Sequence, residues 1–148
     1  MVDSKTVNYE TAAVGENDMM GIQVLMDQLK TLPEQVYRAG QEFDRARYKK
    51  NEAVKKAAEA KANLEMAKAS ATMGMPDTLK NELQRTSYLN VTCAQEVRAL
   101  NAAEAEVLNA ETDILATQRE FYFKQDILTS VQKRAEVATA LMKYLSAR

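Results

Sequence analysis

The C-terminal half of the chain carries apolar residues at every seventh position, a spacing typical of helices that pack in coiled coils. Nine of the ten positions in this series are apolar. The series consists of Leu79, Thr86, Cys93, Leu100, Val107, Ile114, Phe121, Leu128, Ala135 and Met142. Because the phase is kept over so many turns, it predicts one continuous helix over residues 78–145, about 100 Å long at about 1.5 Å per residue. A kink between Thr86 and Thr92, where polar and β-branched residues gather, is the alternative.

The N-terminal half of the chain predicts two more helices. Residues 17–31 begin at Asn17, which is suited to an N-cap, and place apolar residues at helical spacing. The sequence TLPE at 31–34 combines a capping box with a proline in the first turn, so it predicts a new helix over residues 34–71. Residues 1–16 are polar and show no periodicity. We therefore expect a flexible arm there, followed by a single all-helical domain over residues 17–148.

The connection between the two long helices predicts how they pack. Gly74 and Pro76 allow a turn of five or six residues, and helices joined by so short a turn lie antiparallel. Facing residues should then have numbers that add to about 150, as Phe43 and Val107 do. The expected fold is all-α: a short N-terminal helix plus a long antiparallel, coiled-coil-like helical hairpin, whose C-terminal helix overhangs its partner beyond about residue 115.

The overhanging part of the last helix is apolar on more than one side. A face that broad needs more than one neighbour, so we expect the chain to form a homo-oligomer through this region. The candidate interface residues are Leu108, Leu115, Phe121, Tyr122, Phe123, Ile127, Leu128, Val131, Met142 and Leu145.

Composition excludes most site chemistry. The 148 residues include no histidine, the commonest general base and metal ligand, and a single cysteine, which cannot form a zinc site or an internal disulfide. No glycine-rich phosphate loop occurs either. We expect no enzyme, no catalytic residues, no metal, no cofactor and no small-molecule substrate. The N-terminal sequence lacks a secretory signal and no apolar run approaches about 18 residues, so we expect a cytoplasmic protein that does not bind membranes.

The stretch RARYKKNEAVKK, residues 45–56, is strongly basic in a chain whose net charge is −1. One interpretation is a surface for single-stranded nucleic acid, with lysines at the phosphates and a tyrosine stacking on bases. The residues for this role are Arg45, Tyr48, Lys49, Lys55, Lys56, Lys61 and Lys68. The other interpretation is a solvated helix flank that pairs with acids of the return helix. At a sum of 151 the expected pairs are Arg38–Asp113, Arg45–Glu106, Arg47–Glu104 and Lys55–Glu96.

Two segments of the predicted helices are KKAAEAKANLEMAKASATMG, residues 55–74, and QREFYFKQDILTSVQKRAEVATALMKYL, residues 118–145. They resemble the UvsY family of phage recombination mediators. The resemblance implies an oligomeric ring that binds single-stranded DNA and helps load a recombinase onto DNA covered by a single-strand-binding protein. It also implies a phage protein in the host-cell cytoplasm. The family's Lys-Ala-Arg-Leu run near the turn corresponds here to Lys61, Ala62, Asn63 and Leu64, with asparagine in place of arginine.

Two functional hypotheses follow. The first is a non-enzymatic, oligomeric accessory protein that binds single-stranded DNA in phage recombination or replication. The second is a structural or adaptor coiled coil, such as a virion component or a protein-docking inhibitor, that binds no nucleic acid.

Overall fold

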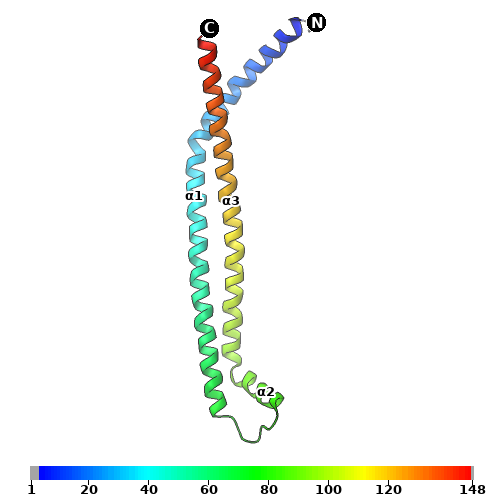
Figure 1. The fold of residues 1–148 in the computed structure, drawn as a ribbon, viewed down its shortest axis with the longest axis vertical. Helices are drawn as coiled ribbons and strands as arrows, with labels where there is room; N and C mark the ends of the chain where they lie inside the picture. Colours follow the sequence, from blue (N-terminus) through cyan, green and yellow to red (C-terminus); the bar gives the residue numbers. More distant parts are fainter. Residues whose placement is uncertain (1–3, 148) are drawn as a thin grey trace. The chain divides into compact units, whose positions relative to one another are not determined.

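Three helices make up the described part of the chain: α1 (Ser4–Met73), α2 (Glu82–Thr92) and α3 (Ala94–Ser146) (Figure 1). The computed structural model describes residues 4–147, with side chains from residue 21 onward. No strand occurs within those residues, and the two long helices α1 and α3 contact each other. The predicted all-helical, hairpin-like fold is confirmed at this level.

Helix α1 continues through the boundary that the sequence predicts at residues 31–34. Pro33 lies inside the helix, although it donates no backbone hydrogen bond. The Thr31 hydroxyl donates to the Asp27 carbonyl at 3.1 Å, the back-bonding of a mid-helix threonine rather than the contact of an N-cap. Leu32 and Ala39 are both buried on one side of this region. One buried side thus runs past the proline, which is compatible with a single helix, and the prediction of two helices was wrong.

The flexible arm predicted over residues 1–16 lies only partly within the described residues. Residues 1–3 lie outside the described residues, and those from Ser4 onward belong to α1. The flexibility of the arm stays a prediction.

The single helix predicted over residues 78–145 was also wrong, because α2 is separate from α3. Asn81 caps the N-terminus of α2, because its side-chain oxygen accepts a 2.7 Å hydrogen bond from the Gln84 N–H. Helix α2 ends at Thr92, and Cys93 separates it from α3. The break lies just beyond the segment where the sequence allowed a kink.

The chain divides into two compact units, each containing a part of α1 and a part of α3. Unit 1 comprises Met1–Gln41 and Gln118–Arg148, and unit 2 comprises Glu42–Thr117. Every contact described below lies within one of them.

The helices pair in a register that differs from the predicted one. In unit 2, Lys50 lies beside Glu111, and Leu64 shares a cluster with Val97. In unit 1, Gly40 lies against the Phe121 ring. In each of these pairs the two residue numbers add to about 161, whereas the prediction was about 150. Within unit 2, a residue later on α1 lies beside a residue earlier on α3. The reason is that residues 74–81 and α2 all belong to the connection, so α3 meets α1 only from Cys93 onward.

Small side chains form the seam between the helices in unit 2. Its buried residues include Ala46 and Ala53 on α1 and Ala103 and Ala110 on α3, each pair seven residues apart. Alanine at these positions lets the two backbones lie close together. The larger residues of the predicted apolar series, such as Leu100 and Val107, are only half-buried.

Candidate functional site

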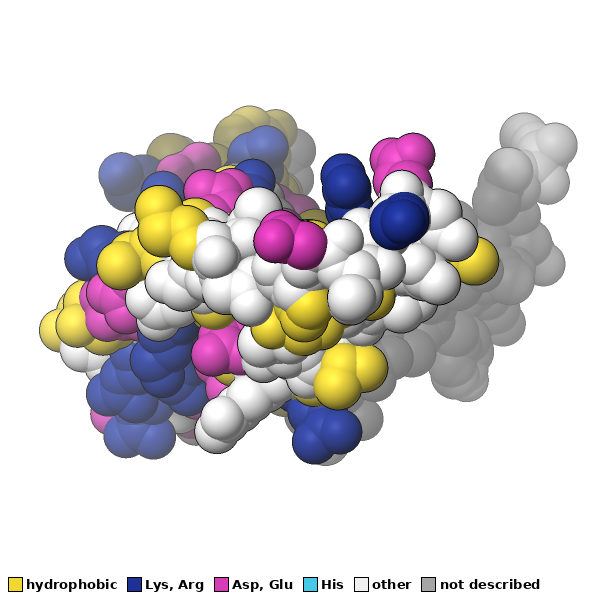
Figure 2. All heavy atoms as spheres, turned by 90° about the horizontal axis from the view of Figure 1, so that it is seen from below, with side chains coloured by type: hydrophobic (Ala, Val, Ile, Leu, Met, Phe, Trp, Pro, Cys, Tyr) yellow, Lys and Arg dark blue, Asp and Glu magenta, His cyan; other side chains and the backbone are white. Residues whose placement is uncertain are grey.

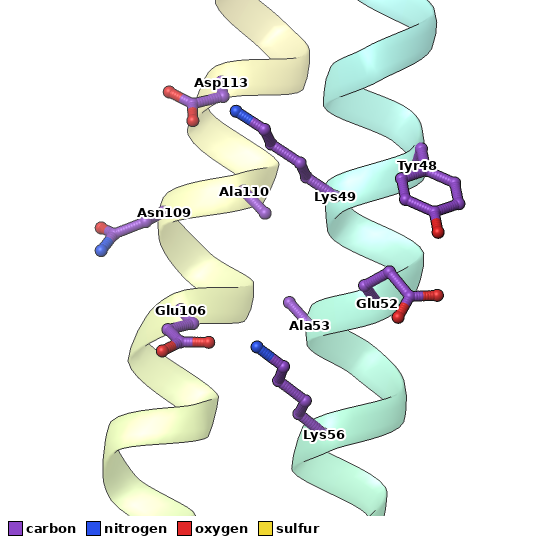
Figure 3. Close-up of a pocket in the computed structure, with 9 residues that line it drawn as sticks. All are labelled: Tyr48, Lys49, Glu52, Ala53, Lys56, Glu106, Asn109, Ala110 and Asp113. Carbon is purple, nitrogen blue, oxygen red and sulfur yellow. The ribbon is translucent and has the colours of Figure 1, made fainter.

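The seven candidate nucleic-acid residues all lie on α1 in unit 2, and all are exposed. Helical spacing nevertheless distributes them over three sides of the helix. Arg45, Tyr48 and Lys55 share the outward side, where Tyr48 is 66% exposed. Figure 3 shows the Tyr48 ring directed away from α3.

Lys49 and Lys56 lie on the edge of α1 that borders α3. Together with three acids they line a groove of about 310 Å³, whose floor includes Ala53 and Ala110. Figure 3 shows Lys49 extending toward Asp113 and Lys56 toward Glu106. The positive charge of these two lysines is therefore offset by carboxylates of the neighbouring helix.

Lys61 and Lys68 lie on the remaining edge. The two residues are seven positions apart, and their spacing from Lys49 and Lys56 places them on the other side of the seam. The structure thus brings Arg45, Tyr48 and Lys55 together on one side. It does not bring the seven residues into one continuous stripe.

The predicted ion pairs between helices are replaced by others. Lys55 pairs with Glu52 at 3.4 Å, and Arg47 lies 4.0 Å from Asp44, both within α1. The Arg47 guanidinium also lies 5.3 Å from the centre of the Phe43 ring. Between the helices, Lys50 Nζ lies 3.9 Å from Glu111 Oε1. Lys55 and Arg47 thus pair within α1 and not with the acids of α3 predicted at a sum of 151, because the register differs. The interpretation of this stretch as a flank salt-bridged to the return helix stays a prediction.

The candidate interface residues divide into two groups. Val131 is 3% exposed, and Phe121, Ile127 and Leu128 are half-buried, so their side chains already pack within the chain. The remaining six are exposed: Leu108, Leu115, Tyr122, Phe123, Met142 and Leu145. Leu108 and Leu115 belong to unit 2, and the other four to unit 1.

An apolar groove in unit 1 was missed by sequence reasoning. It measures about 720 Å³ and is formed by residues 21–28 of α1 and residues 134–145 of α3. Val24 forms part of one wall, and Leu141 and Leu145 part of the other. Sequence reasoning missed the groove because it predicted that the end of α3 extends beyond its partner helix, with little of α1 beside it. The signal available in the sequence was the helical spacing of Ala138, Leu141 and Leu145, which line the groove on α3.

Within the described residues, no group of three or more histidine, cysteine, aspartate or glutamate side chains is placed to hold a metal ion. None of the helices in that part of the chain combines the length and the apolar character that crossing a bilayer requires.

No protein-family model, curated protein or solved structure matches this chain. The resemblance to recombination mediators therefore stays a prediction.

Proposed function

We propose that this chain is a non-enzymatic helical scaffold or adaptor that works by binding protein chains, and that a second copy of itself binds at the apolar groove of unit 1. The observation that carries the proposal is the exposure of apolar side chains on both walls of that groove. Val24 is 55% exposed, Leu141 55% and Leu145 62%. An apolar surface of this kind, on two long helices, fits the addition of further helices to form a bundle.

The charges of the two helices in unit 1 favour a second copy as the occupant. Residues 1–31 contain two bases and five acids, whereas residues 116–148 contain six bases and three acids. A symmetric pair that places the N-terminal segment of one copy beside residues 116–148 of the other brings an acidic segment next to a basic one. A foreign partner would have to supply this complementarity, whereas the chain already carries it.

The spacing of the apolar residues in the α3 wall of the groove also favours a helix as the occupant. Leu141, Met142 and Leu145 are 55%, 51% and 62% exposed, and together with Ala138 they follow the i, i+3, i+4, i+7 spacing of a helix-packing face. Such a face packs against a helix, and a second copy provides one with the same spacing.

The test is the mass of the protein in solution as a function of concentration, measured by sedimentation equilibrium. Wild type should form dimers or larger assemblies. A variant with Val24→Glu and Leu145→Glu, one on each wall, should remain monomeric while keeping its helical circular dichroism. The matched control is Val54→Glu, an exposed valine of α1 in unit 2 that is 46% exposed, which should assemble normally. A monomeric wild type, or a double variant that assembles like wild type, contradicts the proposal.

A second candidate function is binding of single-stranded nucleic acid by the outward side of unit 2. The observation that favours it is the exposed Tyr48 ring between Arg45 and Lys55, an arrangement suited to base stacking and phosphate contact. The recombination-mediator role that the resemblance implies, with a recombinase and a single-strand-binding protein as partners, rests on this candidate.

Tyr48→Ala tests the second candidate against Tyr37→Ala, because both rings are 66% exposed on α1. If the surface binds single-stranded DNA, Tyr48→Ala should weaken the binding of a labelled oligonucleotide about tenfold, and Tyr37→Ala should not. Binding should also weaken with salt. Equal effects of the two substitutions, or no binding at low salt, would remove this candidate and leave the scaffold function standing.

A further inference from the structure

The junction between α2 and α3 contains no residue that breaks a helix. Residues 82–100 include neither glycine nor proline, and no non-glycine residue in the described chain has a positive φ. Cys93, the residue at the break, has φ −101° and ψ 20°. Its N–H donates to the Leu89 carbonyl at 2.8 Å, and its carbonyl accepts from the Val97 N–H at 3.0 Å. Both bonds follow the i to i−4 pattern of an α-helix, so the interruption is short.

The seven-residue apolar series runs through this break without a change of phase. Thr86, Cys93 and Leu100 occupy successive positions of the series, and Leu89 lies three residues after Thr86. If α2 and α3 were one helix, Thr86, Leu89 and Cys93 would all lie on the side that faces α1. The local sequence therefore supports a continuous helix as well as the observed break.

Few contacts hold α2 in its observed position. Tyr88 and Leu89 pack against the cluster formed by Leu64, Ala71 and Cys93. No residue of α2 is buried, and Leu83 and Val91 are 76% and 78% exposed. Figure 2, which views the end of unit 2 that carries the loop and α2, shows hydrophobic side chains at the surface between charged ones.

We infer that α2 is a hinged segment with two positions. In the observed one, here called the folded-back form, Tyr88 and Leu89 pack against the cluster around Leu64 and Ala71. In the other, α2 and α3 form one continuous helix. The continuous form gains the backbone hydrogen bonds that the first N–H groups of α3 lack within their own helix. It extends α3 by the 11 residues of α2 together with Cys93, about 18 Å. The connecting loop at residues 74–81 can span about 26 Å when extended, which is enough to permit the change.

The two forms expose different surfaces at the end of unit 2. The folded-back form covers part of the Leu64–Ala71 surface with Tyr88, whereas the continuous form directs Tyr88 away from α1, because position 88 lies off the side defined by Thr86 and Cys93. A partner that binds one form only shifts the balance toward it.

Amide hydrogen exchange of the full-length protein tests the hinge, with Gln95 and Glu96 as reporters. Their N–H groups belong to the first turn of α3 and gain helical partners only in the continuous form. Tyr88→Ala removes a contact that exists only in the folded-back form, so it should slow exchange at both amides at least tenfold. Val91→Ala, an exposed position in the same helix, should leave both rates unchanged.

A second substitution disfavours the continuous helix and so should reverse the effect of Tyr88→Ala. Ala94→Pro is incompatible with the interior of a continuous helix, because proline removes the N–H that a continuous helix would pair at position 94. Added to Tyr88→Ala, it should return the Gln95 and Glu96 rates to those of wild type. Rates that are unchanged or faster in Tyr88→Ala, or slow rates that persist with proline at position 94, would overturn the inference.

Discussion

The same two helices build both units of this molecule, yet they meet in different ways. In unit 2 the seam is closed by alanines such as Ala53 and Ala110, and its edge carries Lys49 and Lys56 opposite carboxylates. In unit 1 the facing segments leave an apolar groove of about 720 Å³. The open apolar walls of unit 1 are the reason why we propose a binding role for that unit.

The largest expected effect distinguishes the units through two exposed leucines of α3. Leu141 lies in the groove of unit 1 and Leu108 lies in unit 2, at 55% and 64% exposure. Leu141→Lys should weaken self-association about 100-fold or more, because a symmetric dimer contains the substitution twice, while Leu108→Lys should change it little. Sedimentation velocity over a concentration series measures both. Equal weakening by the two would show that unit 2 also binds.

A smaller effect is expected from enlarging the seam of unit 2. Ala53→Leu inserts three carbons where the side chain is 7% exposed and should lower the free energy of unfolding by about 1–3 kcal/mol. Ala58→Leu, at an exposed position of the same helix, is the control and should cost almost nothing. Urea denaturation followed by circular dichroism gives both values. A stable Ala53→Leu variant would mean that the backbones are not held close together.

Gly21 and Gly40, both on α1 in unit 1, should differ by about 1 kcal/mol or less in their response to substitution by alanine. Gly21→Ala should stabilise the helix by up to about 1 kcal/mol, because nothing lies within 4 Å of the added carbon. Gly40→Ala should gain less, since its new Cβ would lie 3.1 Å from the Phe121 ring, which would have to move. Thermal unfolding of the two variants compares them. A larger gain for Gly40→Ala would contradict the close approach of Phe121.

The smallest effect concerns the Lys50–Glu111 pair in unit 2. Both side chains are substantially exposed and their charged atoms are 3.9 Å apart, so a double-mutant cycle with Lys50→Gln and Glu111→Gln should give a coupling of about 0.2–1 kcal/mol. The coupling should fall further at about 1 M salt. A coupling that is stronger and insensitive to salt would show that the charged edges, and not the alanine seam, hold unit 2 together.

The sequence by itself determined the helical fold and the side of each helix that packs. Seven-residue periodicity and high helix propensity are properties of a single helix, so they can be recognised without knowing its neighbour. The alanines at positions 39, 46 and 53 have the same seven-residue spacing and are all buried.

Only the tertiary structure decided where helices end and which residues face each other. Helix α1 continues through Pro33, with Leu32 and Ala39 buried on one side. Helix α2 is separate from α3, and its Tyr88 and Leu89 pack against the cluster around Leu64. Each of these outcomes set a long-range contact against a local preference, so the local sequence could not settle it. Because α2 belongs to the connection, residues that face each other on α1 and α3 have numbers that add to about 161 instead of the predicted 150. That shift replaced the predicted overhang with an apolar groove between α1 and the end of α3.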